Sequence, residues 1–302
     1  MQQLPSLKSG DTIGVFAPSS RIAEERFEAG ANLLRERGYH LKIHEQTYKS
    51  FNQSAGSFEN KARAYRDLLN DQDVKVIMAA AGGNRVSHVL DRLTDHTPAK
   101  ALVGFSDVTN LHCLRYKQAK LPAIFGPTVQ SLTRNKPEQL DYLAALLEGG
   151  TPDYPLDNAA AFRTGDAEGV LLGGTLAMLC SLCGTQYMPD FTGAILYLED
   201  VNEELSRIDR MLWQLRQALP FEKLAGVIFG EFVNCKDEGA TPFGFHFEDL
   251  VREHTEGLEI PVIINAPFGH GENFFSLPFG TRAQLSAGKK NTLHLLEAVT
   301  KA

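Results

Sequence analysis

The sequence contains no run of about 20 apolar residues, which is the length that a membrane-spanning helix needs. It also has no cluster of Lys and Arg: 30 basic against 37 acidic residues give a formal net charge of -7. Without a long apolar run, we expect no membrane as a partner. Nucleic-acid binding needs a basic face, so we expect no nucleic acid either. The opening stretch, MQQLPSLKSGDTIGVFAPSS, has no basic segment before a long apolar core, so we expect no signal peptide and a cytoplasmic protein.

Motifs for nucleotides and metals are missing as well. The chain has no G-x-x-x-x-G-K-[ST], and no G-x-G-x-x-G follows its first expected strand, which argues against ATP and dinucleotide cofactors. Its His, Asp and Glu residues lack H-x-x-x-H or D-x-D-G spacing, so we expect no metal. Cys180 and Cys183 form a C-x-x-C inside the apolar run LAMLCSLCG. No second pair completes a zinc site, and we interpret both as core residues.

What the sequence does contain is a regular alternation of strand-like and helix-like segments. The expected strands are 12–18, 41–46, 74–80 and 100–106, and the expected helices are 25–40, 57–72 and 85–93. This alternation predicts a parallel sheet with helices on both faces. Ligands of such sheets bind beyond the carboxyl ends of the strands, where Gly82-Gly83 and Ser106 fall.

The composition changes near residue 150. The stretch GGTPDYPLDNAAAFRTGDA (149–167) is rich in Gly, Pro, Asp and Thr, which is typical of a domain boundary. We therefore expect an α/β domain over residues 1–150, a linker over 151–167 and a β-rich domain over 168–302.

Ser106, in the stretch VGFSDVTN, has two interpretations. It could be a nucleophile on a strand-to-helix turn, although the second glycine of the G-x-S-x-G pattern is missing. It could instead be a helix N-cap, and the local sequence alone favours this second interpretation. The glycine pair Gly82-Gly83 ends a neighbouring strand, and its backbone N–H groups could form an oxyanion hole with the turn at Ser106. Simple turn chemistry explains that pair equally well.

A nucleophilic serine needs a base and an acid that orients the base. His270 is the leading candidate base because glycines on both sides free the backbone to present its ring, although an ordinary loop histidine would look the same. His88 and His112 are the other candidates, on helices that follow the two turns.

Glu199 and Asp200 end the apolar strand AILYL, and a buried carboxylate there requires a partner. That partner could be Arg207 or Arg210 on the next helix. These arginines could instead bind a substrate carboxylate.

Several segments together resemble the serine LD-carboxypeptidases, the murein tetrapeptide carboxypeptidase family, which also contains the microcin C self-immunity peptidases. They are GDTIGVFAPSS (10–20), AAGGNR (80–85), VGFSDVT (103–109), FGPT (125–128), LLGGTLAMLCSLCGT (171–185), LYLEDVNEELSRIDRML (196–212) and PFGHGENFFSLPFG (267–280). The resemblance spans nearly the whole chain.

The resemblance implies a flavodoxin-like α/β N-terminal domain with a parallel sheet and a smaller, β-rich, swivelling C-terminal domain. It implies Ser106 as the nucleophile, Glu199 as the acid and His270 as the base. It also implies that the backbone amides of Gly83 and Asp107 form the oxyanion hole.

The implied activity is that of a serine carboxypeptidase, a hydrolase without a cofactor. Such an enzyme releases the terminal D-alanine from murein tetrapeptides during cell-wall recycling, as a cytoplasmic homodimer. The substrate is then a muropeptide or peptide with a free terminal carboxylate, for which Arg85, Arg207 and Arg210 are candidate partners. The alternative is a microcin C immunity-type peptidase acting on aminoacyl-nucleotide analogues. The motif GGNR favours this alternative, whereas the length of 302 residues favours the tetrapeptide enzymes.

Two further interpretations lie outside this family. A non-catalytic flavodoxin-like binding protein would use Ser106 only as a helix cap. An α/β-hydrolase shares the chain order Ser, Glu, His, but it would keep G-x-S-x-G and one continuous sheet.

Overall fold

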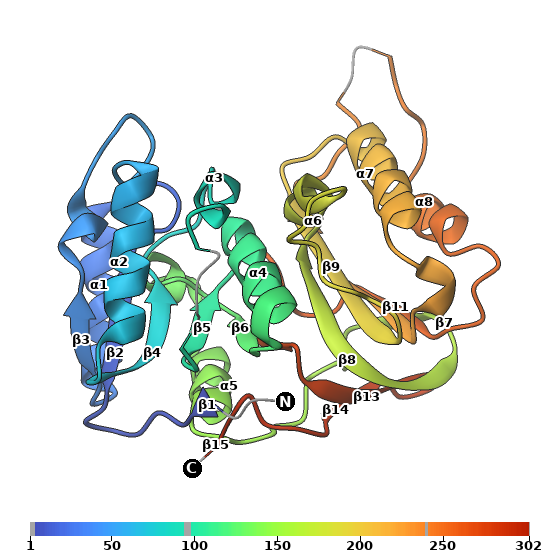
Figure 1. Cartoon of the computed structure of the whole chain (residues 1–302). Coiled ribbons are helices and arrows are strands. Elements are labelled where there is room, and N and C mark those ends of the chain that lie inside the picture. Colours follow the sequence, from blue (N-terminus) through green and yellow to red (C-terminus); the bar gives the residue numbers. More distant parts are fainter. Residues whose placement is uncertain (1–3, 94–97, 239–240, 302) are drawn as a thin grey trace.

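The computed structural model describes residues 4–93, 98–238 and 241–301. The described chain forms two halves that lie side by side, one built on a six-stranded sheet and one on a seven-stranded sheet (Figure 1). The two ends of the described chain meet, because β1 (Leu4–Pro5) pairs in parallel with β15 (Thr300–Lys301).

The first half has a sheet of the flavodoxin type. Its strands are β2 (Thr12–Phe16), β3 (His40–Ile43), β4 (Val74–Ala79), β5 (Ala101–Gly104), β6 (Ala123–Phe125) and β12 (Leu277–Phe279). The order is β12-β6-β5-β4-β2-β3, and every neighbouring pair is parallel except β12 with β6. Numbered along the chain, the five parallel strands lie in the order 2-1-3-4-5, which confirms the expected parallel sheet.

Helices cover both faces of this sheet. They are α1 (Glu24–Glu36), α2 (Phe58–Asn70), α3 (Ser87–Leu90), α4 (Thr109–Ala119) and α5 (Pro137–Leu147), with the 3₁₀ turns η1 (Glu45–Tyr48), η2 (Ser106–Val108) and η3 (Val129–Arg134). Figure 1 shows α2 and α4 on the near face and α1 and α5 on the other. The expected helix over 85–93 is wrong in extent. Arg85 has a φ of 80°, which is outside the helical region, so α3 begins only at Ser87.

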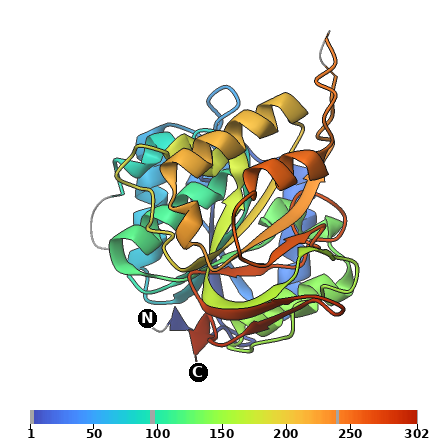
Figure 2. The same cartoon turned by 90° about the vertical axis from the view of Figure 1, so that its right-hand side faces the viewer.

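The second half is a mixed sheet with helices on one side. Its strands are β7 (Ala160–Arg163), β8 (Gly165–Thr175), β9 (Ala194–Val201), β10 (Gly226–Val233), β11 (Val262–Ile264), β13 (Arg282–Ala287) and β14 (Thr292–Leu295), in the order β14-β13-β8-β9-β10-β11-β7. Its helices are α6 (Leu176–Leu182), α7 (Leu205–Ala218) and α8 (Phe247–His254), with the 3₁₀ turn η4 (Phe221–Lys223). The strands β8 to β11 are parallel, whereas β7, β13 and β14 are antiparallel to their neighbours. Figure 2 shows α7 and α8 side by side across this half.

The chain crosses between the two sheets three times: before β7, between β11 and β12, and again between β12 and β13. The expected linker contains β7, which joins the edge of the second sheet. Later, residues 265–276 run from β11 in the second sheet to β12 in the first. This second crossing carries His270 from one half toward the other, and therefore joins the halves at the place where the candidate residues lie.

Aromatic side chains fill the space between the halves. The ring of Phe125, on β6, packs edge-on against Tyr197 of β9 at 5.7 Å and against Phe274 of the crossing segment at 5.9 Å. Phe125 and Tyr197 are fully buried. Large aromatic rings dominate the energetics of such interfaces, so the two halves share one core here.

Candidate active site

Ser106 lies at the carboxyl end of β5, at the first position of η2, and is half-buried. Its φ is 61°, a left-handed conformation that is rare and strained for serine. The N-cap interpretation is wrong, because the cap positions of η2 and α4 are Phe105 and Val108 and neither helix has a side-chain cap. The Ser106 hydroxyl therefore caps neither of these helices.

The glycine pair lies directly against this turn, as the sequence predicts. A Cβ on Gly82 would lie 3.3 Å from Cβ and 3.5 Å from Oγ of Ser106. Gly83 has a φ of 134°, and a Cβ there would lie only 2.0 Å from Oγ of Ser20. Only glycine fits this position, because both the backbone angle and the space exclude a side chain.

Two backbone N–H groups at these turns are free to bind a ligand. Within the described residues, neither Gly83 nor Asp107 donates its backbone N–H to another protein group. For Asp107 the reason is its place in the first turn of η2, where no intrahelical acceptor exists. Free N–H groups of this kind can stabilise an oxyanion.

Buried charges hold the two turns together. The carboxylate of Asp107 is almost fully buried and accepts a hydrogen bond from the backbone N–H of Val86 at 2.9 Å. On the other side, the buried Lys61 ammonium donates to the Ser19 carbonyl at 2.6 Å, and the N–H of Ser20 donates to the Gly82 carbonyl. Burial lowers the pKa of Lys61 to about 8, an effect that the charge of Asp107 opposes.

Glu199 and His270 form a hydrogen-bonded pair. Oε2 of Glu199 lies 2.7 Å from Nδ1 of His270, and Oε1 accepts from the hydroxyl of Thr175. Glu199 is fully buried, whereas the His270 side chain is 15% exposed. Gly269, at a φ of 121°, makes this approach possible, since a Cβ there would lie 2.8 Å from Oε2 of Glu199.

The structure brings Glu199 to His270, the pair that the family resemblance implies. The alternative ion pair of Glu199 with Arg207 or Arg210 does not form in the described part of the chain. Arg207 pairs with Glu203 at 3.1 Å along its own helix. The reason is the crossing segment, which supplies His270 to Glu199 from 71 residues further along the chain. Sequence proximity could not predict that partner.

The pair raises the basicity of the imidazole. Burial of the ring lowers the pKa of His270, but the charge of Glu199 and its hydrogen bond outweigh that effect, so the pKa lies above the ordinary value of 6.5. The ring also packs on Phe105, the residue before Ser106, with centroids 4.8 Å apart. No hydrogen bond joins Ser106 to His270 in the described part of the chain, and such contacts often tighten only when substrate binds.

Asp200 has a different role from its neighbour. Its carboxylate accepts hydrogen bonds from the backbone N–H groups of Ala177, in the first turn of α6, and of Val201, both at 2.8 Å. Burial, with the adjacent charge of Glu199, raises the pKa of Asp200 to about 7. Asp200 therefore orders the start of α6 rather than the imidazole.

The two other candidate histidines are poorly placed for catalysis. His112 is fully buried beside Phe279, and burial lowers its pKa to about 3. His88 is exposed and stacks on Phe58 with ring centroids 5.1 Å apart.

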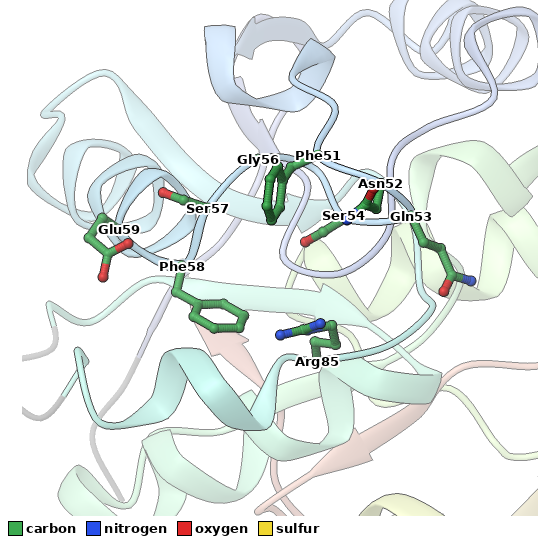
Figure 3. Close-up of a pocket in the computed structure, with 9 residues that line it drawn as sticks. All are labelled: Phe51, Asn52, Gln53, Ser54, Gly56, Ser57, Phe58, Glu59 and Arg85. Carbon is green, nitrogen blue, oxygen red and sulfur yellow. The ribbon is translucent and has the colours of Figure 1, made fainter.

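The three candidate arginines occupy different surroundings. Arg85 lines a pocket beside the glycine turn (Figure 3). Arg207 is engaged with Glu203, and Arg210 is exposed on α7. Trp213, the only tryptophan, also lies on α7 and is 61% exposed.

Sequence reasoning missed Arg134, at the end of η3. Its Nη2 donates to the backbone carbonyl of His270 at 3.3 Å. A small hollow opens here, lined by Phe105, Ser131, Arg134, Asn135, Gly269, His270, Gly271 and Phe274. The signal was present in the sequence, because residues 126–134 follow β6, whose carboxyl end lies beside that of β5.

Cys180 and Cys183 are free cysteines, the first buried and the second half-buried. Among the described residues, no group of three or more His, Cys, Asp or Glu side chains could hold a metal ion. No helix in the described part of the chain is long and apolar enough to cross a membrane.

Comparison with known proteins matches both halves of the chain to one family. Residues 13–126 match the LD-carboxypeptidase N-terminal domain, and residues 168–285 match the LD-carboxypeptidase C-terminal domain. A putative carboxypeptidase of Synechocystis sp. is 30% identical over 98% of this chain and 97% of its own.

The relatives with named activities include both a murein tetrapeptide carboxypeptidase and a microcin C7 self-immunity protein. The murein tetrapeptide carboxypeptidase of Pseudomonas aeruginosa is 29% identical over 92% of this chain and 94% of its own. The microcin C7 self-immunity protein MccF of Escherichia coli is 26% identical over 94% of this chain and 93% of its own. A solved MccF-like protein from Bacillus anthracis superposes with a TM-score of 0.87 at 25% identity, over 98% of this chain and 100% of its own.

Proposed function

This chain belongs to the LD-carboxypeptidase family and is a serine-type carboxypeptidase; we propose that it releases the terminal D-alanine from murein tetrapeptides. One observation carries the proposal. The buried Glu199 is bonded to His270, whose ring packs on the residue that precedes the strained Ser106.

In the first half of the reaction, the neutral imidazole of His270 takes the proton of the Ser106 hydroxyl as its oxygen attacks the scissile carbonyl. Glu199 holds Nδ1, which leaves Nε2 to accept that proton, and stabilises the imidazolium that forms. The N–H groups of Gly83 and Asp107 bind the oxyanion of the tetrahedral intermediate.

The imidazolium then gives its proton to the amine of the departing D-alanine, which completes the first half and leaves an acyl-enzyme on Ser106. In the second half, water attacks the ester as His270 takes its proton, and His270 returns that proton to the Ser106 oxygen as the shortened peptide leaves. Because His270 must reach the leaving nitrogen, the D-alanine lies on the His270 side of Ser106. Arg134 lines the hollow beside His270 on that side. The Arg134 guanidinium can bind the terminal carboxylate that an exopeptidase must recognise.

The alternative is hydrolysis of aminoacyl-nucleotide analogues. An enzyme for such substrates needs an aromatic platform for the base, and Trp213 is exposed on the outer helix α7. Side-by-side assays separate the two. The proposal predicts tripeptide and D-alanine from the tetrapeptide, and it fails if only the aminoacyl-nucleotide analogue is cleaved.

The family resemblance also leads us to propose a cytoplasmic homodimer. Sedimentation equilibrium of the purified chain tests the oligomeric state, with a mass of twice 33.3 kDa expected. A mass of 33.3 kDa at micromolar concentration would contradict it.

A further inference from the structure

A pocket of about 320 Å³ is lined in part by Arg85, two residues after Gly83, and shares no lining residue with the hollow at His270. Figure 3 shows the residues that line it, which come from the loop before α2, the start of α2 and the segment after Gly83: Phe51, Asn52, Gln53, Ser54, Gly56, Ser57, Phe58, Glu59 and Arg85. Phe51 is 66% exposed, which is unusual for so large an apolar side chain.

Arg85 brings an uncompensated positive charge to this pocket. Its guanidinium lies 5.0 Å from the centroid of the Phe58 ring, and Figure 3 shows it beside that ring. Among the described residues it forms no ion pair, although its side chain is exposed. An arginine that is stacked on a ring and has no counter-ion is well prepared to bind a carboxylate with two hydrogen bonds.

Arg92 provides an internal contrast. It approaches the same ring at 5.5 Å, but its Nε pairs with Glu59 at 2.8 Å. Among the described residues that line the pocket, Glu59 is the only acidic one, and Arg92 already neutralises it. The charge of Arg85 remains for a ligand.

The backbone links Arg85 rigidly to the reaction centre. Arg85 follows Gly83 by two residues, which span at most about 7 Å. Val86, the next residue, is fixed by the buried carboxylate of Asp107, and Arg85 itself has a φ of 80°. A strained residue that its surroundings hold in place is typical of a binding site.

The size of the pocket indicates which part of the substrate it takes. The leaving D-alanine is a single small residue, and its place is next to His270. The pocket shares no lining residue with the hollow at His270, and its volume of about 320 Å³ has room for much more than one alanine. The larger acyl part of the peptide is the remaining occupant.

We propose that this pocket binds the acyl part of the peptide substrate and that Arg85 pairs there with one of its carboxylates. This inference rests on the proposed function and adds a specificity to it: the enzyme selects peptides with a free carboxylate upstream of the scissile bond. In a murein tetrapeptide, that carboxylate belongs to the side chain of diaminopimelate or to the residue before it.

The experiment measures kcat/KM for D-alanine release from the free tetrapeptide and from two versions, each amidated at one of these carboxylates. The wild type, Arg85→Gln and the matched control Arg92→Gln are compared. For the wild type, we expect kcat/KM to be about 10- to 100-fold lower with one of the amidated peptides, because a charge-assisted hydrogen bond is lost. Arg85→Gln should cleave all three peptides equally, whereas Arg92→Gln should keep the wild-type preference.

A preference that survives in Arg85→Gln, or that Arg92→Gln removes equally, would overturn the assignment. A wild type that releases no D-alanine from any of the peptides would contradict the proposed function instead. Calorimetric binding of the tripeptide product to Ser106→Ala tests the pocket without turnover. Adding Arg85→Gln should weaken that binding about 10- to 100-fold, and unchanged affinity would again overturn the assignment.

Discussion

The carboxylate of Asp107 accepts a hydrogen bond from the backbone N–H of Val86 at 2.9 Å, although the two residues are 21 positions apart. This bond joins the turn that carries Ser106 to the turn that carries Gly83. The two N–H groups proposed for the oxyanion hole come from these turns, so their separation depends on this one buried carboxylate.

Replacing Asp107 with alanine should therefore loosen the oxyanion hole. We expect kcat for D-alanine release to fall about 100-fold, with little change in KM, because the interaction matters most in the transition state. Asp107→Asn keeps an acceptor oxygen for Val86 and should recover most of the loss. An alanine variant as active as the wild type would show that the bond does not position the hole.

Gly83→Ala should disable the enzyme through its neighbour Ser20, because the new Cβ would lie 2.0 Å from Oγ of Ser20 at a φ of 134°. Activity should fall about 100-fold or more as the turn is displaced. Gly10→Ala is the matched control, since Gly10 also has a positive φ but nothing lies within 4 Å. It should cost about 1–2 kcal/mol of stability and leave kcat unchanged. Equal losses of kcat in both variants would mean that backbone strain alone is responsible.

The pH dependence should follow His270. In the proposed mechanism its neutral form is the base. Its pKa lies above 6.5 because Glu199 stabilises the imidazolium, so kcat/KM should rise with pH to a plateau through a midpoint above 6.5. In Glu199→Gln the charge is gone, so the midpoint should move to lower pH while the plateau drops. A midpoint that stays in place in this variant would show that another group limits the acid side of the profile.

Arg134→Gln should weaken recognition of the terminal carboxylate. We expect a loss of about 10- to 100-fold in kcat/KM with a free terminus, mainly through KM, and no loss with a peptide whose terminus is amidated. Arg207→Gln serves as the control because that guanidinium already pairs with Glu203. Equal losses on both substrates would indicate that Arg134 only supports the His270 loop.

Much of the first half was predictable from the sequence because its strands and helices alternate with clear periodicity. Gly82-Gly83 and Ser106 were correctly expected to meet, since the carboxyl ends of parallel strands share one edge of a sheet. The N-cap interpretation of Ser106, which the local sequence alone favoured, fails because Ser106 has a φ of 61° and caps neither helix. The bond between its neighbour Asp107 and Val86 reaches a turn 21 residues away, and local propensity reveals neither feature.

Other features depend on long-range topology. The partner of Glu199 comes from a segment that crosses between two sheets, and β12 returns to the first sheet far from its other strands in sequence. Arg134 could have been placed at this sheet edge because it follows β6, but its contact with His270 spans 136 residues and depends on the crossing segment. Proximity in sequence suggested Arg207 or Arg210 as partners of Glu199, but Arg207 pairs with Glu203, and only the family resemblance indicated His270.

Release of D-alanine from a murein tetrapeptide by the wild type and by Ser106→Ala is the most direct test. We expect tripeptide and free D-alanine with the wild type, and a loss of at least about 10³-fold in rate for the variant at unchanged thermal stability. A wild type that leaves the tetrapeptide intact, or a Ser106→Ala variant that cleaves it at the wild-type rate, would contradict the assignment.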